Sequence, residues 1–216
     1  MGANRTHDSV TTSPAVGEGS GGTRPRSRGR PRSVEAEKAI LKVAGELLSE
    51  GGFIALNYDE LASRARCSKA TIYRRWATKG HLAVAALAEL PDPPTTPDRG
   101  DLRVELRELL EGIVAIFATT PAIRIMQSLL GERARNPELA DLLDQSFQAR
   151  RRGLAEVLER GLARGELRPG TDIELVMDLI VGPILYRHFC TASTADPDYL
   201  DAVVESALSA YCTASD

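Results

Sequence analysis

The chain has 216 residues, 43% hydrophobic and 26% charged, a composition typical of a globular protein with a substantial core. No apolar run approaches the roughly 20 residues that a membrane-spanning helix needs, and three scattered cysteines provide neither a disulfide framework nor a zinc site. We therefore predict a cytoplasmic protein with no membrane partner, no metal and no cofactor. Residues 1–90 carry a net charge of +5 (14 Lys and Arg against 9 Asp and Glu), whereas residues 91–216 carry −8 (13 against 21). This asymmetry indicates that only the first part meets a polyanion.

Residues 1–32 are predicted to be a disordered, Arg-rich arm, because residues 1–23 are mostly small and polar and RPRSRGRPR follows them. Within this arm, Arg28-Gly29-Arg30-Pro31-Arg32 resembles the core of an A·T-hook, in which extended arginines lie in a narrow minor groove. The alternative is a basic tail that touches phosphates without order. The candidates for minor-groove contacts are Arg28, Arg30 and Arg32.

Residues 33–90 are predicted to form four helices. Ser33, Asn57 and Ser68 are suitable N-terminal caps, and Gly51-Gly52 should stop the first helix. Ile72 and Trp76 are four residues apart and should pin the third helix onto the first two. The Pro-rich segment PDPPTTPDRG ends the fourth helix and marks a domain boundary. The predicted helices are 34–50, 58–65, 69–76 and 79–90.

The helix predicted at 69–76 has the features of one that enters the DNA major groove. Such a helix needs short or flat side chains and hydrogen-bond donors at its N-terminal end, where it meets base edges. Groups suited to phosphates follow, and the next helix offers free N–H groups at its start. The alternative is a solvated charged face on an ordinary helical hairpin. We predict base contacts from Lys69, Ala70 and Thr71 and phosphate contacts from Tyr73, Arg74 and Lys79.

At these residues the chain resembles the N-terminal helix-turn-helix domain of the TetR family of bacterial regulators. The resemblance covers roughly residues 33–85 and rests on Gly52-Phe53, Asp59-Glu60-Leu61-Ala62, Ser68–Tyr73 and Lys79. It implies a dimer whose last two helices form a four-helix bundle, and a ligand pocket in the second domain. It also assigns base contacts to Lys69, Ala70 and Thr71 and phosphate contacts to Tyr73 and Lys79.

The chain departs from the family at the turn before Ser68, which usually contains Gly and here reads Arg66-Cys67. A left-handed backbone at Arg66 would cost about 1 kcal/mol. The geometry of this turn is thus the point at which the resemblance is weakest.

Residues 33–90 are thus predicted to be a three-helix helix-turn-helix DNA-binding domain with a linking fourth helix. Residues 91–216 are predicted to be a helical effector-binding and dimerisation domain, so the fold class is all-α. The segment 171–174 reads as a capping box, and the run Arg150-Arg151-Arg152 is interpreted as a solvated face. The predicted helices are 102–119, one from Pro121 to Asn136, 137–164, one starting at 171–174, and 198–212.

Large apolar side chains at helical spacing are candidates for an effector pocket, although plain core packing is the alternative. These candidates are Phe117, Met126, Phe147, Met177 and Tyr186. The run LVMDLIVGPILYRHFC is apolar almost all round, as expected for a helix covered on both sides, and Gly182-Pro183 should kink it. The candidates for a dimer interface are Leu179, Gly182, Pro183, Tyr186, Val204 and Leu208.

Together these features predict a homodimeric transcriptional regulator, a repressor of a roughly palindromic operator that a small-molecule effector releases. The alternative is a nucleoid-associated architectural protein that uses the Arg-rich arm in the minor groove. The sequence has no HExxH motif, phosphate loop or nucleophile elbow, so we predict that the chain is not an enzyme.

Overall fold

A computed structural model describes residues 30–191 and 193–212, and for residues 30–33 the backbone alone. In this part of the chain every regular element is helical, and the β pairing is limited to an isolated bridge between Leu167 and Cys212, which confirms the all-α prediction. The elements are α1 (Arg30–Ala55), α2 (Tyr58–Arg64), α3 (Lys69–Tyr73), α4 (Lys79–Ala88), α5 (Leu102–Thr119), α6 (Ala122–Arg133), α7 (Pro137–Ala163), α8 (Ile173–Tyr186), the π-helical turn η1 (Arg187–Thr191) and α9 (Pro197–Leu208).

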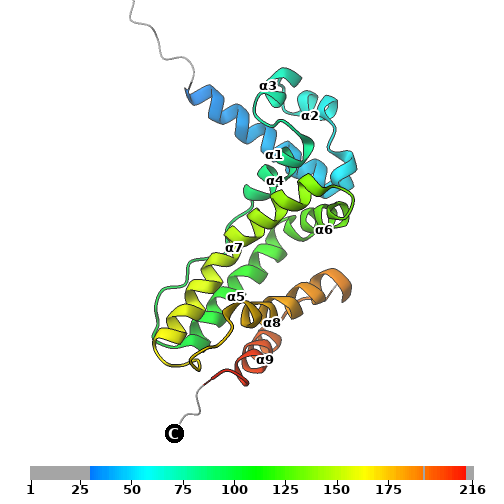
Figure 1. Ribbon diagram of the computed structural model, residues 1–216. Helices are drawn as coiled ribbons and strands as arrows, with labels where there is room; N and C mark the ends of the chain where they lie inside the picture. The colour runs from blue at the N-terminus through cyan, green and yellow to red at the C-terminus, as the bar shows by residue number, and fades with distance from the viewer. Residues whose placement is uncertain (1–29, 192, 213–216) are drawn as a thin grey trace, which may run out of the picture.

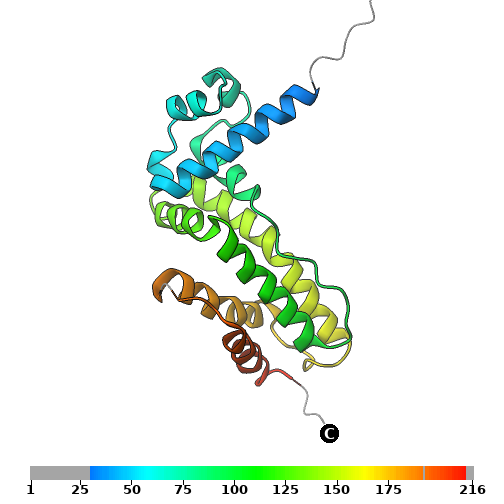
Figure 2. The same ribbon diagram turned by 180° about the vertical axis from the view of Figure 1, so that it is seen from behind.

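The helices form an elongated molecule (Figure 1). Helices α1–α3 lie at one end and α8 and α9 toward the other, while α5 and α7 run along the length between them. The view from behind shows the segment between α4 and α5 following the outside of these two long helices (Figure 2).

Helix α1 begins at Arg30, ahead of the predicted cap Ser33. Arg30 and Arg32 therefore have helical backbone, and the extended conformation predicted for them is wrong; Arg28 lies outside the described residues. Pro31 does not prevent this, because a proline is tolerated in the first turn of a helix, where its missing N–H has no helical partner.

Gly52 breaks α1 where the sequence predicts a stop. Its φ of 71° and ψ of −164° are not helical, and a last turn follows to Ala55. The side chain of Ser128 in α6 accepts a 2.7 Å hydrogen bond from the N–H of Phe53 directly after the kink. The corner between α1 and α2 is therefore held by a helix from beyond the Pro-rich segment.

The predicted caps of the two short helices are confirmed. The side chain of Asn57 accepts from the N–H of Glu60 at 2.8 Å, and that of Ser68 from the N–H of Thr71 at 3.2 Å. At α8 the prediction is wrong by one residue, because the cap is Asp172, whose carboxylate accepts from the N–H of Leu175 at 3.2 Å.

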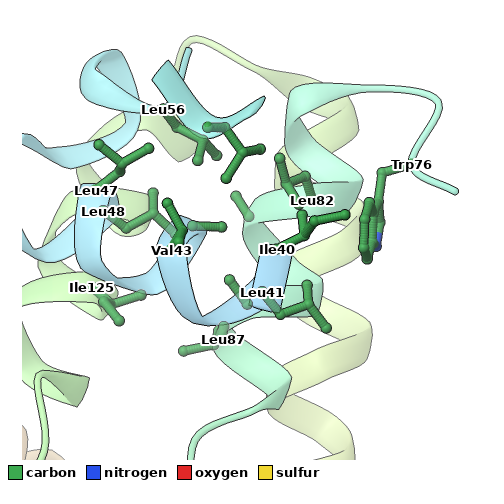
Figure 3. Close-up of a cluster of buried hydrophobic side chains, with 14 of the residues drawn as sticks. Ile40, Leu41, Val43, Leu47, Leu48, Leu56, Trp76, Leu82, Leu87 and Ile125 are labelled. Atoms are coloured by element: carbon green, nitrogen blue, oxygen red, sulfur yellow. The ribbon is translucent and has the colours of Figure 1, made fainter. Parts of the chain in front are cut away.

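Two hydrophobic clusters form the core, and they do not divide at residue 90. The first joins α1–α4 to residues of α6 and of the first half of α7, including Leu139. Figure 3 shows Ile125 of α6 beside the side chains of α1 in this cluster. The second joins α5, the second half of α7, α8 and α9. The predicted boundary at 91–100 is therefore a boundary in the sequence only, because helices α1–α4 share their core with α6 and α7, which follow it.

Glu105 of α5 is fully buried and holds α5, α7 and the preceding segment together. Its carboxylate accepts from Arg160 at 2.7 Å and from the N–H of Arg99 at 3.0 Å, and it forms an ion pair with Arg164 at 3.1 Å. Arg160 also donates to the carbonyl of Thr96 at 3.0 Å. A buried charge of this kind is tolerated because all its partners are in place.

Among the described residues, no single helix is long and apolar enough to cross a membrane. Helices α5 and α6 taken together have the length and composition for it, but they meet at an angle of 86°.

Candidate nucleic-acid interface and ligand cavity

Helix α3 turns its polar face outward because its apolar residue anchors it to the core. Ile72 is fully buried and Trp76, just beyond the helix, is nearly so, as predicted. The other α3 side chains lie on the opposite face. Thr71 is half-buried, and the exposed residues are Lys69, Ala70, Tyr73 and, just after the helix, Arg74. The residues predicted to contact bases thus lie together at the start of one accessible helix.

The turn between α2 and α3 contains a residue with left-handed backbone, at the Arg66-Cys67 position where the sequence departs from the family. Arg66 has a φ of 51°, the one positive φ outside glycine in the described part of the chain. Its N–H donates to the carbonyl of Ser63 at 3.3 Å, and the N–H of Cys67 donates to that of Ala62 at 3.0 Å. This is the hydrogen-bond pattern of a Schellman motif, so an arginine closes α2 where glycine is usual. Burial raises the pKa of the Cys67 thiol, against the opposing charge of Arg75.

The ammonium of Lys69 forms an ion pair with Asp59 of α2. The hydrogen bond to Asp59 raises the pKa of Lys69, so this side chain is fully charged at neutral pH. Both groups are largely exposed, and an exposed pair of this kind contributes little stability. Lys69 can therefore exchange Asp59 for a base edge or a phosphate at small cost.

Tyr73 lies against Tyr58, with ring centroids 4.5 Å apart. Burial, reinforced by the neighbouring Tyr73, raises the pKa of Tyr58. The contact fixes the Tyr73 ring at the surface of α3 while about half of the residue stays exposed. This position suits the predicted phosphate contact.

The side chain of Lys79 makes its contacts within the protein. Its ammonium donates to the carbonyl of Ile54 at 3.3 Å and lies 4.6 Å from the centre of the Phe53 ring. Burial lowers its pKa. The side chain thus supports the corner after the Gly52 kink, and the phosphate contact of Lys79 stays a prediction that rests on the N–H groups at the start of α4, where Thr78 is the cap.

A cavity of about 480 Å³ lies between the end of α4, the segment after it, and helices α5–α8. Phe117, Met126 and Phe147 line it, as predicted. Met177 and Tyr186 do not: Met177 is buried in the second core cluster, and Tyr186 is 62% exposed. The reason is the rotation of α8, which turns Met177 toward the second core cluster and places other residues at the cavity wall. Those α8 residues are Asp178, Val181, Gly182 and Leu185.

The cavity wall is apolar except for three charged side chains, Arg150, Arg151 and Asp178. The interpretation of 150–152 as a solvated face is therefore wrong for Arg150, which binds the backbone at the end of α4. Its guanidinium donates to the carbonyls of Leu87 at 2.7 Å, Leu90 at 3.3 Å and Pro91 at 3.2 Å. The helical spacing 143, 147, 150 and 154 places Arg150 on the inner stripe of α7, a signal that the three-arginine run concealed.

The candidates for a dimer interface fall into two groups. Val204 and Leu208 are buried in the core of the same chain, so their assignment to a dimer surface is wrong. Helix α9 has one apolar face, and that face is already covered. On α8, Leu179 and Gly182 are exposed, Pro183 is half-buried and Tyr186 is exposed, so this helix still offers an apolar surface.

Comparison with known proteins agrees with this architecture. Residues 40–86 match the model of bacterial regulatory proteins of the tetR family, and residues 96–207 match that of the tetracyclin repressor-like C-terminal domain. The HTH-type transcriptional regulator YdeS of Bacillus subtilis is 37% identical over 83% of this chain and 91% of its own length. The DNA-binding transcriptional repressor TetR of Mycobacteroides abscessus is 30% identical over 74% of this chain and 84% of its own length.

Among solved structures, the TetR family transcription regulator SCO0332 superposes with a TM-score of 0.64 and 29% identity, covering 83% of this chain and all of its own. Both halves of the chain are thus accounted for by one family. The chain belongs to the TetR family and is a helix-turn-helix transcriptional regulator.

Proposed function

We propose that the protein is a homodimeric repressor of a roughly palindromic operator, and that a small, mostly apolar effector in the cavity releases it. The observation that carries the proposal is the position of the cavity: its wall includes the end of α4, the helix that begins directly after the DNA-reading segment. A ligand that alters this wall displaces α4 and with it α3. Ligand and DNA then disfavour one another.

The apolar stripe on α8 supports dimerisation. Leu175, Leu179 and Tyr186 recur at helical spacing and are 46%, 43% and 62% exposed, and Gly182 lies between them. A stripe of this kind is expected to be covered by another surface. Two copies joined through it would present two α3 helices to successive major grooves, about 34 Å apart.

Replacing Lys69 and Thr71 together by alanine should weaken operator binding by about 30-fold or more, because each of the two base contacts contributes about 1–3 kcal/mol of discrimination and about 1.4 kcal/mol corresponds to a tenfold change in affinity. The measurement is a fluorescence-anisotropy titration of duplex DNA taken from upstream of the protein's own gene, which also gives the number of chains per operator. Arg152→Ala removes one charge from an exposed site on α7 and serves as the control. An operator affinity that the double substitution leaves unchanged would show that these α3 side chains do not contact the operator.

Filling the cavity with Ile116→Trp should abolish the response to effectors while leaving operator affinity intact, since Ile116 lines the cavity away from α3. A thermal-shift screen of small molecules identifies ligands whose binding Ile116→Trp blocks. At least one of them should lower the operator affinity of the unmodified protein. A set of cavity ligands that all leave operator binding unchanged would contradict release by an effector.

A further inference from the structure

Arg150 joins the wall of the cavity to the helix that leads to the DNA-binding segment. Its guanidinium holds three backbone carbonyls, those of Leu87, Leu90 and Pro91, at 2.7–3.3 Å. Leu87 lies in the last turn of α4, where the carbonyls carry the negative end of the helix dipole, and its carbonyl also accepts from the N–H of Leu90 at 3.2 Å. One side chain of the cavity wall thus fixes the position of this end of α4.

Arg150 has less negative charge around it than its neighbour. Arg151 forms ion pairs with Asp178 at 2.9 Å and with Glu174 at 3.1 Å. The carboxylate facing Arg150, that of Asp92, is 3.8 Å away and its side chain is 85% exposed, so its effect is strongly screened.

Arg150 is also more deeply placed, since only 20% of its side chain is exposed. Burial lowers the pKa of Arg150, but a guanidinium remains charged in proteins. A largely buried cation in an apolar wall, held by neutral carbonyls, is suited to receive an anion.

Resting on the proposed function of this cavity, we infer that the effector is an apolar molecule bearing a carboxylate, and that this carboxylate draws the Arg150 guanidinium away from the backbone carbonyls at the end of α4. A carboxylate is the stronger acceptor, because it carries the opposite charge and can accept two parallel N–H bonds from the guanidinium, whereas the backbone carbonyls are neutral. The apolar body of the ligand fills the rest of the cavity, whose size is in the range of small-molecule sites. The end of α4 then loses its restraint, and the change passes along α4 toward α3.

The first test compares acids with their uncharged counterparts on the full chain without DNA. Isothermal calorimetry is run with decanoate, dodecanoate and 2-naphthylacetate and with the primary amide of each. At least one acid should bind about 10-fold or more tightly than its amide. Arg150→Gln should abolish this difference, whereas Arg152→Gln, an exposed site on the same helix, should keep it. The inference is overturned if none of the acids binds, if acids and amides bind equally, or if the difference survives Arg150→Gln.

The second test follows the restraint itself by amide hydrogen exchange in residues 87–92. Exchange there should rise when the acid binds and also in Arg150→Gln without ligand, while Arg152→Gln should leave it unchanged. A general loss of stability in Arg150→Gln would also speed exchange, but it would leave the acids binding more tightly than their amides in the calorimetric test. Unchanged exchange in both cases would overturn the restraint.

Operator titration with the same ligands separates this inference from the proposed function. Acids that bind through Arg150 without changing operator affinity would support the carboxylate site and contradict the repressor model. Amides that release the operator as well as acids would leave the repressor model standing and overturn the role of Arg150.

Discussion

Replacing Glu105 by alanine should lower the free energy of unfolding by about 3 kcal/mol, at the lower end of the range for breaking a buried ion pair. The carboxylate is fully buried, whereas the side chains of Arg160 and Arg164 are 29% and 23% exposed and keep some contact with water. The substitution leaves two guanidiniums and the N–H of Arg99 without their common acceptor. It should therefore loosen α5 from α7 and from the segment before α5 as one event.

Urea denaturation at a fixed protein concentration measures this effect, since the stability of a dimer depends on concentration. The matched control is Glu111→Ala on the same helix, whose ion pair with Arg107 lies at the surface and should contribute less than about 1 kcal/mol. Equal losses for the two variants would show that the Glu105 network has no special importance.

Local signals in the sequence predict the DNA-binding part well. Asn57 and Ser68 are recognisable as caps because a short side-chain oxygen satisfies N–H groups only a few residues away. The buried pair Ile72 and Trp76 follows from helical spacing in the same way. Each of these features depends on neighbours within about one helical turn, so the sequence alone contains the information.

The second domain is harder, because the role of an apolar residue there depends on which helix covers it. Met177 and Leu185 both have side chains suited to a pocket, and the packing of α8 sends the first into the core and the second to the cavity. Val204 is a second example: the sequence suggests that it contacts a partner subunit, whereas it packs in the core of its own chain. The run of three consecutive arginines indicates a solvent-exposed face, although the helical spacing of α7 places Arg150 at the cavity wall.

Replacing Ile72 by alanine should abolish most operator binding while leaving most of the fold in place. Helix α3 has five residues and one fully buried side chain, so its attachment depends on Ile72 to an unusual degree. Replacing a buried Ile by Ala costs about 2–5 kcal/mol, and this loss falls on the helix that we propose reads the DNA. If α3 opens locally, operator affinity falls in proportion to the fraction of molecules that keep it docked, an expected loss of about 10-fold or more.

Leu158→Ala is the matched control, because Leu158 is equally buried but belongs to the second core cluster on α7. Both variants should lose a similar amount of global stability by urea denaturation. Only Ile72→Ala should show faster amide exchange in residues 69–76 and a large loss of operator affinity, measured at a temperature at which both proteins are folded. If Leu158→Ala weakened operator binding as much, the loss would reflect general instability. Leu158 lies in the second core cluster, so its replacement should leave the docking of α3 unchanged.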